Sequence, residues 1–179
     1  MSKAIDELKH DHDAILFALK ILEKMLAGIP ANTTSKQDLL DFIGFLKEFA
    51  DKCHHGKEEG LLFPALVNAG MPQQQGPIAV MLSEHVEGRQ FIQQMEANLA
   101  SSVNYQRFTD AANGYIHLLR QHIEKENNVL FVMAEQMLTP TQLEQLHHAF
   151  EKHEESVIGH GRHEELHAML KDLRKKYQV

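Results

Sequence analysis

Apolar residues recur along most of the chain with the spacing of three and four that is typical of amphipathic helices. The first such stretch predicts a helix over residues 2–27, with one histidine inside an otherwise apolar seam. A core-facing position normally takes an apolar side chain, so the histidine needs a particular reason to be there. The seam consists of Ile5, Leu8, His12, Ile15, Leu19, Leu22 and Leu26.

Three further long stretches have the same period, and histidine or glutamate again interrupts each apolar seam. Glycine and proline separate the stretches, as expected where helices end. Four long helices with short or moderate connections predict an all-α fold, an up-down-up-down four-helix bundle over residues 1–138. The three further helices are expected at residues 35–68, 78–100 and 104–137.

The remainder of the chain, residues 139–179, predicts a separate helical extension. Its two amphipathic helices are expected at residues 141–157 and 162–177, with a Gly-His-Gly break between them. Because both are amphipathic, we expect the extension to pack on the bundle or to take part in an oligomer contact.

One ten-residue pattern occurs twice, at residues 54–63 and 122–131. The copies share His at the first position, Glu at the fifth and Leu-Phe at the end. On a helix, residues four apart lie one turn above each other on the same face. A neutral imidazole nitrogen and a carboxylate presented together in this way can clamp a metal ion.

A lone histidine on the first and on the third predicted helix completes a weak internal duplication. Hydrogen-bonded core histidines and ion-paired glutamates would explain any one of these polar residues, whereas metal binding explains all of them together, because a buried carboxylate needs compensation. Imidazole and carboxylate ligands suit Fe, Mn or Zn, and the set is too large for one four-ligand zinc site. It suits two irons bridged by two glutamates. The candidate ligands are His12, His54, Glu58, His85, His122 and Glu126.

Composition excludes several other classes of protein. The chain has 179 residues and a net charge of −7, which argues against a nucleic-acid partner. We find no apolar run long enough to cross a bilayer and no signal peptide, so we expect no membrane association. The single cysteine, Cys53, excludes an internal disulfide, and a cytoplasmic location is the expectation. Thirteen histidines are the unusual feature.

The run His-His-x-Lys-Glu-Glu-x-x-Leu-Phe-Pro at residues 54–64 resembles the hemerythrin family, in its bacterial hemerythrin-like (HHE cation-binding) branch. Residues 12–15, 84–89 and 122–131 match it as well, so that the resemblance covers about residues 5 to 137. It implies a four-helix bundle with a non-haem di-iron centre. Glu58 and Glu126 would bridge the irons, and the four candidate histidines would be terminal ligands.

The chain also departs from the oxygen-carrying members of that family. They have a second histidine on the third helix, where this chain has Arg89, and an Asp one residue beyond the position of Glu126. Reversible oxygen carriage is therefore not a firm expectation, and the role of Arg89 is left open. The missing ligand could be water, Tyr115, the neighbouring His55, or one of the tail histidines His160, His163 and His167.

The resulting hypothesis is a di-iron protein that binds or reacts with O₂, peroxide or NO, either in oxygen sensing or in an oxidative or nitrosative stress role. Zn or Mn could substitute for the iron. A conventional enzyme is not expected, and any activity would be of a peroxidase or catalase type. Iron storage or delivery and a structural zinc-binding bundle are the alternatives, and a homodimer is left open. The tail also spells HExxH at residues 163–167, which we interpret as a chance match to the zinc-peptidase motif.

Overall fold

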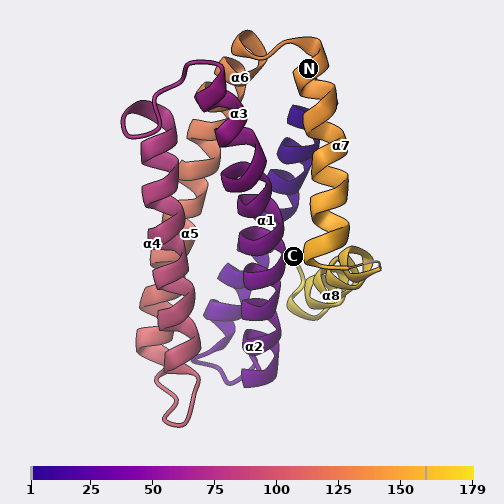
Figure 1. The fold of residues 1–179 in the computed structure, drawn as a ribbon. Coiled ribbons are helices and arrows are strands. Elements are labelled where there is room, and N and C mark those ends of the chain that lie inside the picture. Colours follow the sequence, from indigo (N-terminus) through magenta and orange to yellow (C-terminus); the bar gives the residue numbers. More distant parts are fainter. Residues whose placement is uncertain (1, 160) are drawn as a thin grey trace.

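The computed structural model of the chain describes residues 2–159 and 161–179. Within these residues every regular element is a helix, which confirms the predicted all-α class. Figure 1 shows the long helices lying side by side, with α8 crosswise to α7. The elements are α1 (Lys3–Gly28), α2 (Lys36–Phe45), η1 (Leu46–His55), η2 (Glu58–Leu62), α3 (Phe63–Asn68), α4 (Gly76–Asn98), α5 (Tyr105–Lys125), η3 (Glu126–Leu130), α6 (Phe131–Met137), α7 (Pro140–Val157) and α8 (Arg162–Tyr177).

Two of the predicted long helices are composite. The helix expected at residues 35–68 runs unbroken from α2 to α3, and the one expected at 104–137 runs from α5 to α6. In each, π-helical segments interrupt the α-helix: η1 and η2 in the first, η3 in the second. π-Helical turns are rare and are found mostly at functional sites.

The sequence offers a physical reason for the π segments. Inward-facing residues in this region follow one another at intervals of four, namely Leu46, Ala50, His54, Glu58 and Leu62. On a pure α-helix each such step overshoots a full turn by roughly 40°, so the row would wind away from the core. Because a π turn holds more residues than an α turn, the π segments keep the row facing inward.

Polar side chains divide the apolar core into two clusters. On α1, Ile5 and Leu8 belong to one cluster and Ile15 and Leu19 to the other, with the buried His12 between them. Along each of the two composite helices, buried polar residues likewise separate residues of one apolar cluster from residues of the other. The polar residues of different helices therefore lie at one level of the molecule.

Side-chain caps define where the main helices begin. Each cap oxygen accepts a hydrogen bond from a backbone N–H of the first turn, which would otherwise have no partner. Thr139 and Gln142 form a reciprocal capping box at the start of α7. The other caps are Ser2 on α1, Ser35 on α2 and Asn104 on α5.

The C-terminal helices contribute to the same core. α7 packs against α1, η1 and η2, and α8 packs against α1. Phe150 of α7 is fully buried in one apolar cluster, and Leu166 and Leu170 of α8 are buried in the other. Gly161 stands before α8 with a φ of +81°, a left-handed conformation that glycine adopts without strain.

None of the helices in the described residues combines the length and apolarity that a bilayer-crossing segment requires.

Candidate metal centre

Seven titratable side chains converge at the level between the two apolar clusters. They come from six elements of the fold, and each is at most 3 % exposed. All six sequence-predicted ligands are among them, and His55 is the seventh. The residues are His12 on α1, His54 and His55 on η1, Glu58 at the start of η2, His85 on α4, His122 on α5 and Glu126 at the start of η3.

These side chains form two groups that could each hold a metal ion. Within a group, one ligand atom from each residue lies within 4.8 Å of all the others. Glu58 belongs to both groups, so the two candidate positions adjoin. One group is His55, Glu58, His85 and His122, and the other is His12, His54, Glu58 and Glu126.

The carboxylate of Glu58 faces one group with each oxygen. Its Oε1 lies 3.6 Å from Nε2 of His54, whereas its Oε2 lies 3.4 Å from Nε2 of His85. This is the orientation that a carboxylate needs to bridge two cations. Glu126 differs, because one and the same oxygen approaches a histidine of each group. Its Oε2 lies 3.1 Å from Nε2 of His12 and 3.2 Å from Nε2 of His122.

Each of the five histidines turns Nδ1 away from the two groups, toward a side-chain oxygen of another helix or of the preceding turn of its own helix. Such outer contacts fix the orientation of a ligand imidazole and leave the inner nitrogen available to a metal. Asp51 approaches His55 at 3.4 Å without the geometry of a hydrogen bond. The other Nδ1 atoms contact Asn127 (His12, 2.9 Å), Asp11 (His54, 3.2 Å), Glu59 (His85, 2.7 Å) and Glu84 (His122, 3.0 Å).

The inner atoms are largely without hydrogen-bond partners. Among the described residues, both carboxylate oxygens of Glu58 and of Glu126 are buried and make no hydrogen bond, and the same holds for Nε2 of His12, His54 and His55. Buried polar groups in native proteins nearly always have a partner, and an uncompensated buried carboxylate is strongly unfavourable. A set of imidazole nitrogens and carboxylate oxygens left unpaired at one point therefore fits metal ions.

The charges within the cluster couple its protonation states. Burial disfavours the imidazolium, but the carboxylate of Glu126 outweighs this and raises the pKa of His122 to about 10. Burial and the neighbouring His85 instead hold the pKa of His55 well below its usual value. The pKa values of His12 and His85 are raised as well, so protons on the inner nitrogens of these three rings would offset the buried carboxylates where no cation does so. Metal binding at these nitrogens would release them.

Arg89 takes part in the outer layer of this cluster. Its guanidinium donates to Asp51 and to Glu59, at 2.7 Å in each case. These are the carboxylates that face the outer nitrogens of His55 and His85. Arg89 therefore contacts neither glutamate of the two metal-holding groups.

Two of the open options for the missing ligand are not in either group. Tyr115 is buried and its hydroxyl has no described partner, but it joins neither set, and burial and the nearby Asp51 raise its pKa. His163 and His167 of α8 lie beside each other and belong to neither group. His160 lies outside the described residues.

The structure places His55 in the cluster, whereas the sequence offered it only as one of several options for the missing ligand. The repeated pattern pairs His54 with His122 and gives His55 no counterpart, which hid its part in the cluster. Two consecutive histidines before a Glu-containing turn were the available signal. Both rings reach the cluster, and the ring of His55 stacks on that of His85 with centroids 3.8 Å apart.

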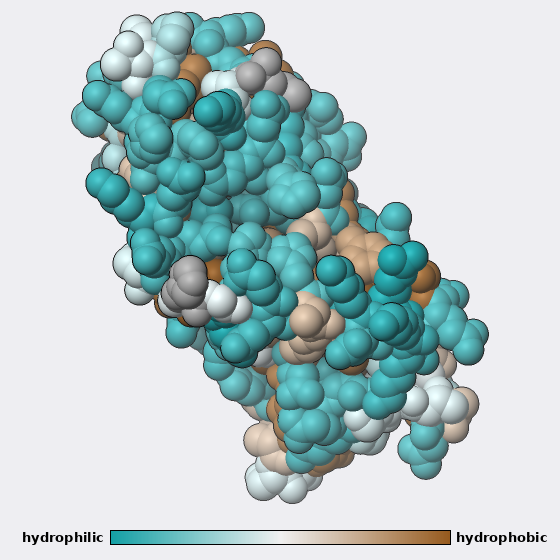
Figure 2. Space-filling model, turned by 90° about the vertical axis from the view of Figure 1, so that its right-hand side faces the viewer, coloured by the Kyte–Doolittle hydropathy of each residue, from teal (hydrophilic) through white to brown (hydrophobic). Residues whose placement is uncertain are grey.

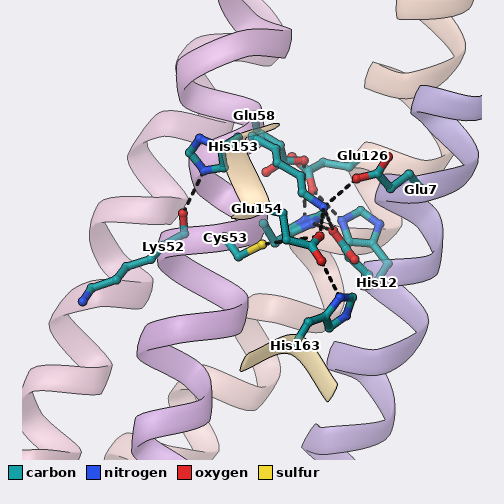
Figure 3. Close-up of polar contacts among 12 residues, drawn as sticks. Glu7, His12, Lys52, Cys53, Glu58, Glu126, His153, Glu154 and His163 are labelled. Carbon is teal, nitrogen blue, oxygen red and sulfur yellow. Dashed lines mark hydrogen bonds and ion pairs between the residues drawn. The ribbon is translucent and has the colours of Figure 1, made fainter. Parts of the chain in front are cut away.

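A buried lysine connects this cluster to the C-terminal helix α7. The ammonium of Lys57 is fully buried and donates to Glu7 at 2.7 Å, Asp11 at 3.2 Å and Glu154 at 3.1 Å. Figure 3 shows Glu7 and Glu154 meeting there beside His12 and Glu58. Since Asp11 also accepts from His54, α7 is tied through Lys57 to a candidate ligand.

Comparison with known proteins assigns the chain to a family. The hemerythrin HHE cation binding domain matches residues 3–134, which is most of the chain and includes all seven residues of the cluster. The protein therefore belongs to the hemerythrin family of cation-binding domains, as the sequence motifs predicted.

Curated relatives match over a shorter region. The iron-sulfur cluster repair protein YtfE of Escherichia coli O157:H7 is 34 % identical over 88 residues, 45 % of this chain and 40 % of the relative. The proteins of the same name from Escherichia coli O1:K1 and Escherichia fergusonii are 33 % identical over the same shares. The chain thus matches well under half the length of these relatives. No solved structure matches it.

Proposed function

We propose that the protein binds two iron ions in a hemerythrin-like, up-down-up-down four-helix bundle. Glu58 and Glu126 bridge the ions, and the five cluster histidines are the terminal ligands. The observation that carries this proposal is the carboxylate of Glu58, whose two unpaired oxygens face different groups of imidazole nitrogens. Zn or Mn could occupy the same ligands, because imidazole and carboxylate do not distinguish strongly among these metals.

The proposed function is to bind or react with a small ligand, either O₂, NO or peroxide, in a stress response. Iron held here would supply redox chemistry and affinity for such ligands. With Glu126 as a second bridge, one ion would have four protein ligands and the other five, which leaves room for a small ligand on an octahedral ion. Phe131 stacks on His12 at 5.2 Å and Phe63 on His85 at 5.9 Å, so apolar rings limit the access of bulk water. A conventional enzyme is not proposed.

Iron delivery is the second candidate function. The relatives that match part of this chain are named iron-sulfur cluster repair proteins, which supports a role in stress and is compatible with donating iron. A delivery protein would release its iron to an acceptor, whereas a ligand-binding centre would keep it. The buried single cysteine, Cys53, is consistent with the cytoplasmic location we propose for either role.

Metal analysis combined with optical spectroscopy tests the proposal. The protein would be expressed in iron-supplemented medium, purified, reduced, and then exposed separately to air, NO and peroxide. We expect two irons per chain and a spectral change with at least one of these ligands, without loss of iron. Zinc alone and no colour would favour a structural zinc bundle. Much more than two irons per chain would favour storage, and transfer of iron to an apo iron-sulfur protein would favour delivery.

A further inference from the structure

Outside the seven-residue cluster, α8 carries a second pair of facing imidazole nitrogens. His163 and His167 are one helical turn apart, and their Nε2 atoms lie 2.8 Å from each other. The ring of His163 is 29 % exposed, so the pair is accessible from solvent. Two imidazole nitrogens four residues apart on a helix are a common chelating arrangement for divalent metals.

Both rings are held in this orientation by other elements. The carboxylate of Glu154 on α7 accepts from Nδ1 of His163, a contact drawn in Figure 3. Phe49 of η1 contacts both rings, with centroid distances of 5.5 Å to His163 and 5.6 Å to His167. His163 therefore has a carboxylate on Nδ1 and presents Nε2 toward Nε2 of His167, so that a carboxylate orients a potential ligand ring as in the buried cluster.

The surroundings of the pair favour a cation. His163 lines a cavity of about 500 Å³ between α1, α7 and α8, together with carboxylates that include Glu151, Glu155 and Glu164. Figure 2 shows that the face carrying α7 and α8 is largely hydrophilic. Carboxylates gathered around a concave surface raise the local concentration of cations.

We propose that His163 and His167 bind one divalent transition-metal ion of the class that prefers imidazole, such as Zn²⁺, at a site separate from the buried cluster. Among the described residues no third His, Cys, Asp or Glu atom completes a set with these two nitrogens. Solvent would therefore fill the remaining positions. The same fact argues against a peptidase centre, despite the HExxH order, because such a centre needs a third protein ligand. The site is exchangeable rather than structural.

Zinc binding to the iron-loaded full chain tests this proposal. Equilibrium dialysis against Zn²⁺, with zinc and iron measured in the same samples, should give one zinc per chain in addition to the resident iron. His167→Gln should weaken this zinc binding by about tenfold or more, while iron content stays unchanged. This variant keeps the pair between Glu154 and His163 intact, so its effect reports the lost ligand.

Two comparisons make the test decisive. His163→Gln should weaken zinc binding to a similar degree, whereas the exposed His117→Gln and His148→Gln should leave it unchanged. The proposal is overturned if no zinc binds beyond the iron, or if His167→Gln binds zinc as tightly as the unmodified chain. A loss of iron from His167→Gln would also overturn it, because the two sites would then not be separate.

Discussion

His85 and Arg89, one turn apart on α4, are held by the same carboxylate oxygen. Oε1 of Glu59 lies 2.7 Å from Nδ1 of His85 and 2.7 Å from a guanidinium nitrogen of Arg89. At the position where the oxygen-carrying members of the family have a second histidine, this chain has Arg89. Its guanidinium holds Glu59, the hydrogen-bond partner of His85. The arginine acts on the proposed centre through Glu59.

That relationship predicts the effect of removing the shared carboxylate. Glu59→Gln should weaken metal binding by about 10- to 100-fold, because the neutral amide is a weaker acceptor for His85 and loses the ion pair with Arg89 that holds it in place. Competition with a chromophoric chelator measures the affinity. The exposed Glu87→Gln on α4 is the control and should bind metal normally. Equal affinities for the two variants would contradict a role for Glu59.

A second prediction concerns the unequal positions of the two glutamates. Glu58 belongs to both groups and Glu126 to one, so Glu58→Ala should lose both ions. Glu126→Ala should keep an ion at the group of three histidines. Iron per chain, measured by elemental analysis, distinguishes the variants. Retention of two irons by Glu58→Ala would exclude a bridging role.

His55 is the ligand assignment that most needs a separate test. His55→Ala should reduce the iron content from two per chain to one, because the group of His85 and His122 loses an imidazole. His148→Ala, an exposed histidine on α7, serves as the control. If His55→Ala still holds two irons, His55 has only a packing role.

The buried ammonium of Lys57 predicts a large effect on stability. Lys57→Met should destabilise the fold by about 3–5 kcal/mol, since it leaves three carboxylates facing one another without their cation. Urea unfolding at neutral pH measures this. Lys47→Met removes an exposed pair with Glu96 and should cost no more than about 1 kcal/mol. Similar costs for both variants would contradict this account.

Asp38 predicts a dependence of stability on pH. Burial disfavours its carboxylate, but Lys176, at 2.6 Å, and Tyr177 outweigh this and lower its pKa below the ordinary 3.8. A lowered folded-state pKa stabilises above the ordinary value, and this stability is lost as the pH falls through the folded-state value. Asp38→Asn should therefore lower Tm by about 2–4 °C at pH 7.

The difference in Tm should shrink toward zero as the pH falls below about 3.8. Thermal unfolding of both chains across this range measures it, with the exposed Asp41→Asn as a control that should change little. A difference that persists unchanged in acid would mean that the contact does not depend on the charge of Asp38.

The sequence was sufficient for the helices and for six of the seven clustered residues, because apolar period and misplaced polar residues are local signals. The boundaries of α8 agree with the expected residues 162–177, and those of α1 with 2–27 to within one residue. The sequence could not show which segments are π-helical rather than α-helical. Whether His55 faces inward depends on the π segment η1, and this in turn depends on packing against other helices. The partners of Arg89 and Lys57 depend on tertiary contacts in the same way.

Sharing Glu58 between the two groups links their occupancies. An ion in one group would fix the orientation of the carboxylate that the other group also requires, so the first loading event prepares the second. Iron supplied in less than the full amount would then divide the molecules into filled and empty ones, with few half-filled. Such a protein would respond to iron supply in a sigmoidal manner, as linked binding sites do.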